Sequence, residues 1–489
     1  MTRCCPLILN SIQILRVFFL FASVVLTGCG FQSYAAKPLD VNQISQKISH
    51  KTPHSDEFKQ YLINNGYPAA LIPIKQWGLT ELSYCAIFFH PSLDVARTQW
   101  RAAQLAESTA AIRPSPSIGT NLGKSNNAND DISPYLFGLS IDIPIETAGK
   151  RDIRIARATH LSQAAKLEIA QTAWALREQV ASALTNYHSN LAQIELLKKE
   201  VAHRDALVAM YLKRATLGVA SSLEVSNARL QSHSAHNELN AKVHNTHVLL
   251  AQLASSTGLP LHVIQDMPLA DHMDSELVAK NLNADNLAVQ SDALLNRLDI
   301  RIALERYASA EAKLKQEIAG QYPDLSINPA YTYEFGNKVW SLGISGLLTL
   351  LHKNKLAIAE ATQLREVEAA QFEVLQNKII SDTASVIAEL EKAKQVLSQQ
   401  TALYQRQQGQ TAKMQSRFNA GEIDRIELTM ANLEELSFEK SLLLAKFQLL
   451  SVLQNIETLT QKPLGTHADK SDTTIIDKLT LQAPSKESL

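Results

Sequence analysis

The sequence of 489 residues contains little glycine and proline, 17 and 16 residues respectively. Both fractions lie below the usual ~7% and ~5% of proteins. Because these residues interrupt regular structure, their scarcity excludes a fold of many short elements joined by tight turns. Alanine, leucine, glutamine, glutamate and lysine are abundant instead, and all are good helix formers. The composition therefore predicts long helices.

The chain also lacks an excess of charge of either sign, since 47 Lys and Arg stand against 48 Asp and Glu. A protein that binds nucleic acid through bulk electrostatics is normally strongly basic, so we expect no nucleic-acid partner. The mean hydropathy of −0.10 excludes a protein with many membrane-spanning helices. It does not exclude transmembrane β-strands, whose alternating pattern raises mean hydropathy very little.

Cysteine is scarce, and Cys4, Cys5 and Cys29 lie near the N-terminus. Cys85 is the only cysteine in the body of the chain, so no internal disulfide is expected there, and zinc-site spacings are absent. We expect Cys85 to be a small buried apolar residue.

Signatures of common catalytic sites are missing as well. GxSxG, HExxH and P-loop patterns are absent, and Gly343-Ile344-Ser345-Gly346 lacks the spacing of a nucleophile elbow. We therefore expect no enzyme activity, no catalytic residues, no metal and no cofactor.

The N-terminus has the pattern of an export signal. The uncharged stretch 17–26 has the length of a signal-peptide core and is too short for a membrane-spanning helix, which needs ~20 residues. It leads into Leu26-Thr27-Gly28-Cys29, which resembles a bacterial lipobox. We predict a signal peptide at residues 1–28 and lipid attachment at Cys29. Gly30 after the cysteine favours the outer membrane over retention at the inner membrane.

An internal repeat of roughly 200 residues organises the rest of the chain. Three pairs of segments recur in the same order at offsets of 203 to 205: Leu93-Asp94 with Leu298-Asp299, the start at Lys150 with that at Lys353, and Arg214-x-x-x-Gly218 with Arg417-x-x-x-Gly421. Each unit opens with a helix of about 20 residues, predicted at 92–112 and 298–318.

Two alternating stretches follow in each unit, at 117–123 and 135–143, and at 325–335 and 340–345. Alternation of apolar and polar residues predicts strands with one apolar face. Lengths of about nine to eleven residues match transmembrane strands. Six aromatic residues suit a membrane-interface girdle: Tyr135, Phe137, Tyr331, Tyr333, Phe335 and Trp340. A half-buried hairpin away from any membrane would alternate equally well, but the export signal favours the membrane.

Long helical segments without proline run from 150 to 218 and from 353 to 421, and shorter helices are predicted at 221–257 and 425–462. Each long segment reaches about 100 Å as a helix. Four strands cannot close a barrel, and open edges in lipid leave backbone groups unpaired, so several chains must pool strands. Two chains would give eight strands and an interior largely filled by side chains, whereas three would give twelve strands and room for a lumen, which suits a conduit better.

Further motifs complete the pattern: His90-Pro91-Ser92-Leu93-Asp94-Val95-Ala96, Arg113-Pro114-Ser115-Pro116 and Gly149-Lys150-Arg151. With the lipobox at Cys29 and the two Arg-x-x-x-Gly motifs, they resemble the TolC-like outer-membrane efflux factor family over roughly residues 80–462. Gly149-Lys150-Arg151 resembles the family's heavy-metal resistance branch.

The resemblance implies a mainly α protein with a transmembrane β-barrel contributed by several chains. In a homotrimer, this gives a 12-stranded barrel and an α-helical periplasmic tunnel, anchored by lipid in the outer membrane. Such trimers dock on a periplasmic adaptor and an inner-membrane pump, and they serve as passive conduits that expel metal ions or drugs.

The resemblance also assigns roles to residues at the helix-to-helix turns. The adaptor contacts would be Arg214, Leu217, Gly218, Val219, Arg417 and Gly421. Asp424 and Glu427 would form an acidic ring at the periplasmic mouth that selects or gates cations. Each set has a plainer explanation, since glycine permits the positive φ of a tight turn and acidic residues favour a helix start.

Four histidines form a possible stripe on one face of the helix after the first turn: His233, His236, His244 and His247. Two i,i+3 pairs could bind zinc or copper. Because no carboxylate or cysteine accompanies them in the sequence, we interpret them as unrelated polar residues and predict no metal site.

We predict five segments: a signal peptide (1–28), a lipidated N-terminal arm (29–85) that is polar and irregular over residues 30–80, repeat 1 (86–285), repeat 2 (286–463) and a weakly ordered tail (464–489). The alternative function is a periplasmic adaptor or a structural envelope lipoprotein with helical hairpins. An adaptor, however, would need many more strands on a single hairpin.

Overall fold

The computed structural model describes residues 32–126, 133–270, 297–346 and 353–462. Residues 1–50 and 51–489 form two separate compact units. The described part of the first unit contains helix α2 (Val41–Ser49), which is capped by Asp40. The Asp40 side chain accepts hydrogen bonds from the backbone N–H groups of Asn42 and Gln43, and no side chain of α2 is buried.

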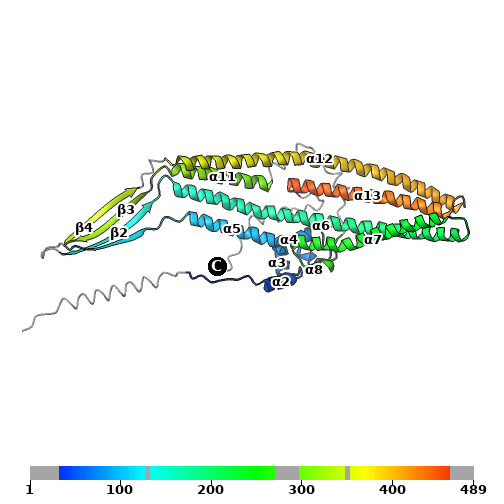
Figure 1. Cartoon of the computed structure of the whole chain (residues 1–489), viewed down its shortest axis with the longest axis horizontal. Coiled ribbons are helices and arrows are strands. Elements are labelled where there is room, and N and C mark those ends of the chain that lie inside the picture. The colour runs from blue at the N-terminus through cyan, green and yellow to red at the C-terminus, as the bar shows by residue number, and fades with distance from the viewer. Residues whose placement is uncertain (1–31, 127–132, 271–296, 347–352, 463–489) are drawn as a thin grey trace, which may run out of the picture. The chain divides into compact units, whose positions relative to one another are not determined.

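The second unit is mainly helical with one small sheet, as predicted (Figure 1). Its described elements in chain order are α3 (Asp56–Asn64), the 3-10 helix η1 (Ala69–Leu71), α4 (Leu79–Phe89), α5 (Pro91–Ala110), β1 (Ser117–Lys124), β2 (Tyr135–Ile145), α6 (Lys150–Thr216), α7 (Ser222–Thr257), α8 (Leu261–Gln265), α11 (Leu298–Ala319), β3 (Leu325–Glu334), β4 (Asn337–Gly346), α12 (Lys355–Asn419) and α13 (Arg425–Thr460). The predicted order of helix, two strands, long helix and shorter helix therefore occurs twice.

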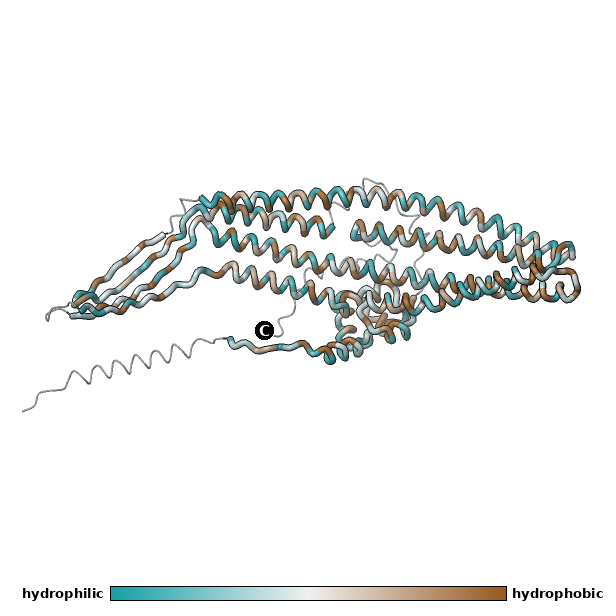
Figure 2. Tube along the Cα trace, viewed as in Figure 1, coloured by the Kyte–Doolittle hydropathy of each residue, from teal (hydrophilic) through white to brown (hydrophobic). Residues whose placement is uncertain are grey.

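The sheet is antiparallel in the order β1-β2-β3-β4, so β2 and β3 join the two repeats. Tyr331 lies opposite Leu139 of β2 and Trp340 of β4, and the centroids of the Tyr331 and Trp340 rings are 4.8 Å apart. All residues of β1 and β4 are exposed. Figure 2 shows hydrophobic residues interspersed along the strands. Among the described residues, β1 and β4 each pair on one side only, so the sheet has two open edges there, and it carries exposed apolar side chains such as Trp340.

The long helices run side by side away from the sheet (Figure 1). Helices α5 and α7 follow one another along α6, and α11 and α13 follow one another along α12. Helix α6 also packs against α11 and α13, which joins the repeats. At this contact the Arg177 guanidinium lies 2.7 Å from the Glu457 carboxylate, and both side chains are largely buried.

Among the described helices, none combines the length and the hydropathy needed to cross a membrane.

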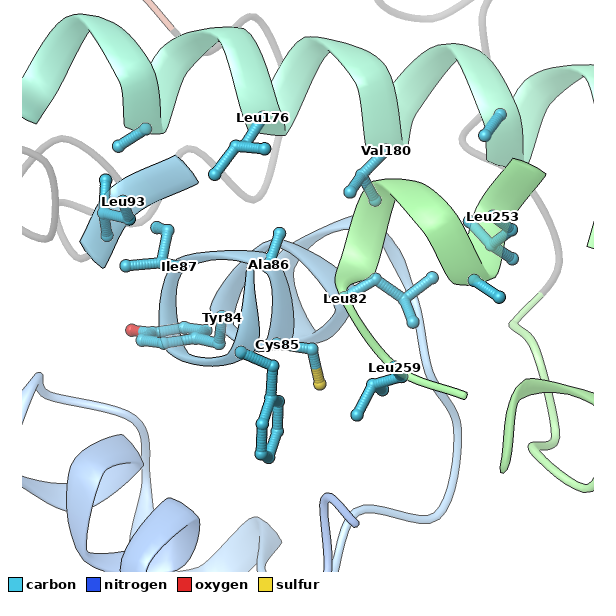
Figure 3. Packing of buried hydrophobic residues seen from close by; sticks show 14 of the residues in the cluster. Leu82, Tyr84, Cys85, Ala86, Ile87, Leu93, Leu176, Val180, Leu253 and Leu259 are labelled. Atoms are coloured by element: carbon cyan, nitrogen blue, oxygen red, sulfur yellow. The ribbon is translucent and has the colours of Figure 1, made fainter. Parts of the chain in front are cut away.

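The main hydrophobic core lies where α4 packs against α6 and α7. Figure 3 shows Leu82 and Ala86 of α4 on the side of Leu176 and Val180 of α6 and Leu253 of α7, while Cys85 lies on the opposite side of α4, near Leu259. Cys85 has 0% exposure, which confirms its prediction as a buried apolar residue. Burial raises the pKa of its thiol well above the usual range.

The prediction that residues 30–80 are irregular is wrong for their described part, which contains helices α2 and α3 and the 3-10 helix η1. Aromatic packing explains the order in α3 and α4. Phe58 is fully buried, and its ring centroid lies 5.4 Å from that of Phe88 and 5.3 Å from that of Phe89. These partners lie about 30 residues apart in the sequence, so helical periodicity alone does not reveal them.

Candidate functional site at the helical tips

The first tip is the turn between α6 and α7. Gly218 has a φ of 73°, and its N–H donates to the Ala215 carbonyl. The N–H of Val219 donates to the Arg214 carbonyl over 3.0 Å. These two bonds form a Schellman motif, which ends a helix with a residue in the left-handed region.

The second tip, between α12 and α13, repeats this geometry. Gly421 has a φ of 77° and donates to the Phe418 carbonyl, while the N–H of Glu422 donates to the Arg417 carbonyl over 2.9 Å. The repeated Arg-x-x-x-Gly motif therefore has a local structural cause, because each arginine supplies the carbonyl that closes the turn and each glycine supplies the positive φ.

The two tips present different surfaces. At the first tip Leu217, Val219 and Leu223 are 71%, 70% and 66% exposed. Among the described residues of the second tip, no large apolar side chain is comparably exposed; Arg417 and Glu422 are exposed there, and Arg417 Nε donates to Glu422 Oε2 over 3.1 Å. An apolar knob therefore lies on repeat 1 and a charged turn on repeat 2.

An ion pair connects the tips. Arg214, in the last turn of α6, donates a short hydrogen bond to Asp424 Oδ2. The other oxygen of Asp424 accepts from the backbone N–H groups of Ile426 (2.7 Å) and Glu427 (3.0 Å) and caps α13. The Glu427 N–H first, and then Arg214 and the Ile426 N–H, lower the pKa of Asp424 below its ordinary value. Asp424 is therefore a helix cap and a link between the tips, whereas the Glu427 side chain is exposed.

The acidic residue of the first tip is also a cap. Glu224 accepts from the backbone N–H of Ser221 over 2.7 Å, and the Ser221 hydroxyl accepts in turn from the N–H of Glu224. This reciprocal capping box lowers the pKa of Glu224. An acidic residue that caps a helix start therefore describes Glu224 fully and Asp424 in part, because Asp424 also binds Arg214.

A groove of about 560 Å³ runs between α12 and α13 above the second tip. It is lined by Gln407, Gln410, Lys413, Met414, Arg417, Glu427, Met430, Ala431 and Glu434. Sequence reasoning missed this groove. The spacing of Gln407, Gln410, Met414 and Arg417 indicates one helical face, but which helix lies opposite is a tertiary property.

The structure does not bring the histidine stripe into a metal site. His236 Nε2 lies 3.1 Å from Asp205 Oδ2 of α6, while His233, His244 and His247 are exposed. Within the described ranges, no group of three or more His, Cys, Asp or Glu residues is placed to hold a metal ion. The predicted lipid-attachment residue Cys29 and the signal peptide lie outside the described residues.

This architecture defines a class of protein: two repeats of paired strands and long helical hairpins, with the sheet at one end and the tips at the other. Residues 86–259 match the family model described as outer membrane efflux protein. The resemblance to the TolC-like outer-membrane efflux factor family is therefore confirmed.

Two curated relatives have efflux or resistance in their names. The chain is 27% identical over 196 residues to the toluene efflux pump outer membrane protein TtgF of Pseudomonas putida, a match that covers 39% of this chain and 38% of that protein. It is 26% identical over 282 residues to the cobalt-zinc-cadmium resistance protein CzcC of Cupriavidus metallidurans, covering 55% of this chain and 62% of that protein. The chain thus matches less than two thirds of the length of either relative.

Solved structures share the fold over a larger part of the chain. The outer membrane protein VceC of Vibrio cholerae is 18% identical, with a TM-score of 0.64 over 78% of this chain and 95% of that chain. The CmeC outer membrane channel of Campylobacter jejuni is 13% identical, with a TM-score of 0.61 over 92% of this chain and 98% of that chain.

Proposed function

We propose that the chain is the outer-membrane channel component of a tripartite efflux system, a passive trimeric conduit that carries solutes from an inner-membrane pump out of the cell. The observation that carries the proposal is the four-stranded sheet with two unpaired edges, at one end of two helical hairpins of 36 to 67 residues per helix. An enzyme needs a reactive constellation of side chains, whereas a conduit needs only this geometry, and we propose no catalytic role.

Pairing of sheet edges supports a trimer. Edge β1 of one copy can pair with edge β4 of the next, which removes every open edge once the ring closes. Three copies give twelve strands and a lumen. The chain would thus lie in the outer membrane with its helices in the periplasm. The exposed Trp340 and Tyr135 suit the membrane interface.

The tips would contact a periplasmic adaptor through Arg214, Leu217, Gly218, Val219, Arg417 and Gly421. Leu217 and Val219 support this role because large apolar side chains exposed on a rigid turn favour a partner. Asp424 and Glu427 would contribute an acidic ring at the mouth, with Glu427 supplying the solvent-facing charge.

The substrate class is proposed from the two relatives, whose names cite toluene in one case and cobalt, zinc and cadmium in the other. We favour metal ions, because the match to CzcC covers the larger share of this chain. Lipid attachment at Cys29 would hold the chain at the outer membrane by acyl chains, which together give stable anchoring.

Channel conductance tests the function. We expect the full-length protein, purified in detergent and added to a planar lipid bilayer, to produce discrete ion-conducting steps. Expression in a Gram-negative host without its own efflux channels, together with the cognate adaptor and pump, should restore resistance to zinc or cadmium. Absence of conductance from a correctly folded, membrane-inserted protein would contradict the proposal, and resistance to toluene alone would correct the substrate.

A further inference from the structure

The junction between the strands and the long helices is held together by buried or half-buried ion pairs. Lys150 Nζ donates to the Tyr322 carbonyl (2.7 Å) and to Asp324 Oδ1 (2.8 Å), which joins α6 to the segment after α11. Arg154 donates to Glu146 Oε1 over 2.5 Å and to the Ala110 carbonyl over 2.9 Å, which joins α6 to the end of α5.

The start of α12 belongs to the same junction. Asn354 Nδ2 donates to the Glu317 carbonyl of α11 over 2.9 Å and to the Glu317 carboxylate over the same distance. The carboxylates of Glu146, Asp324 and Glu317 are thus all engaged within the junction. They leave little negative charge to neutralise further cations.

Four basic residues of the junction have no such acidic partner, and we call them the basic collar: Arg113, Arg151, Lys353 and Lys355. Arg113, Lys353 and Lys355 are exposed, and none of the three has an ion pair to another described residue. Arg151 donates from Nε to the Ala111 carbonyl over 2.9 Å, a neutral partner. Asp152, which follows Arg151 in the sequence, has an exposed carboxylate, and its negative charge offsets one of the four positive charges.

Some lysines along the helices do face an acidic residue three or four positions away, as in Lys198 with Glu195, Lys315 with Glu311 and Lys394 with Glu391. Such pairing neutralises a surface in water. The collar residues have no such neighbour in an ion pair among the described residues, so positive charge is left exposed beside the sheet.

A shallow depression of about 580 Å³ lies at the same level. It is lined by Thr147, Ala148, Tyr322, Pro323 and Leu325, and the Tyr322 side chain is 59% exposed. Apolar walls with an aromatic rim suit the glycerol and upper acyl region of a lipid.

We propose that phospholipids bind around the basic collar: Arg113 and Arg151 beside β1 and β2, and Lys353 and Lys355 beyond β4, bind lipid phosphates, and the depression at the ends of β2 and β3 takes a glycerol region. The inference rests on the proposed function, because it needs the strands to enter a membrane. The proposal is supported by charge complementarity between the collar and an anionic head group, because basic residues next to a membrane surface attract anionic lipids. The site would fix the depth at which the helices leave the bilayer.

Native mass spectrometry of the full-length trimer tests the site, with phosphatidylglycerol or phosphatidylcholine added to the detergent. We expect the wild type to retain phosphatidylglycerol with about tenfold preference or more. The variant R113Q/K353Q/K355Q should lose this preference. The control K198Q/K199Q/K392Q, which removes three exposed charges elsewhere on the helices, should keep it. Tyr322→Ala should lower retention of both lipids.

The outcomes separate this inference from the proposed function. If the collar variant forms a conducting trimer and retains lipids as the wild type does, the lipid site at the collar is refuted and the channel function is not affected. Displacement of phosphatidylglycerol by millimolar inorganic phosphate would make the collar a site for free anions and would overturn the lipid. A wild-type protein that forms no membrane-inserted trimer would refute both.

Discussion

The two long helices are almost equal in length but bury their side chains very differently. Helix α6, with 67 residues, has twenty buried residues, whereas α12, with 65 residues, has seven. Helix α6 packs against α4, α5, α7, α11 and α13, while α12 packs mainly against α11 and α13. One repeat therefore forms the interior of the protomer, and the other leaves much of its long helix uncovered.

The uncovered surface of α12 is partly apolar. Leu356, Leu364, Val367 and Val374 are between 48% and 88% exposed. Leu364, Val367 and Val374 follow a spacing of three and seven residues, which is typical of a seam between packed helices. The difference between the repeats thus indicates where a neighbouring chain of the proposed trimer would pack. It also predicts that substitutions in the two repeats affect different properties.

The largest effect is expected at the ion pair between the repeats. Arg177→Met removes the guanidinium that lies 2.7 Å from the Glu457 carboxylate, whose side chain is 8% exposed. Removing one member of a buried pair costs about 3–5 kcal/mol. We expect a corresponding decrease in the free energy of unfolding, measured by urea denaturation followed by circular dichroism. The double variant Arg177→Met with Glu457→Leu should recover most of the loss, and equal destabilisation of both variants would contradict the assignment.

A comparable decrease in the free energy of unfolding is expected for a truncation in the core of repeat 1. Leu82→Ala removes a side chain of 0% exposure from the interface of α4 with α6 and α7. Such truncations cost about 2–5 kcal/mol. The matched control Leu230→Ala, at a position 70% exposed, should leave the urea midpoint unchanged. A small effect at Leu82 would mean that α4 is dispensable for the fold.

The charge of Asp424 should have a smaller, pH-dependent effect. Because its pKa is lowered in the folded state, the charge stabilises the protein above the ordinary carboxyl pKa of 3.8 and ceases to do so as the pH falls through the lowered value. Asp424→Asn keeps the helix cap but removes the charge, so it should cost up to about 1 kcal/mol at neutral pH. The melting temperatures of the wild type and the variant should become equal at a pH below the lowered pKa. A difference in melting temperature that does not change with pH would argue against a role of the charge.

The smallest expected effect is a gain. Gly409 lies inside α12 without a positive φ, and a methyl group added at its Cα would meet open space, whereas the repeat places Ala206 at the corresponding point of α6. Gly409→Ala should therefore stabilise the helix by about 0.5–1 kcal/mol, and Ala206→Gly should cost as much. Thermal melts of the two variants check this, and destabilisation by Gly409→Ala would show that the glycine meets a packing constraint.

Most of the fold was predictable because its signals are local. Alternation predicted the four strands, and scarcity of glycine and proline together with the repeat placed the six main helices within a few residues of their observed ends. The arm before residue 86 was not predictable, since its order depends on contacts such as Phe58 with Phe88.

The candidate site was predictable only in part. The positive φ of Gly218 and Gly421 was expected from the motif and is confirmed. The ion pair of Arg214 with Asp424 joins residues 210 positions apart, so no local pattern reveals it. The groove between α12 and α13 and the basic collar are likewise products of the assembled helices. The roles of the tips in adaptor contact and of Asp424 and Glu427 in an acidic ring stay predictions.

The mass of the detergent-extracted protein on unboiled and boiled gels tests the central claim most directly. We expect an SDS-resistant species of three protomers that dissociates to one on boiling. We expect the variant L364D/V374D, on the uncovered face of α12, to run as a folded monomer without boiling. A wild-type protein that remains a monomer in membranes, or a variant that still forms the resistant trimer, would contradict the account.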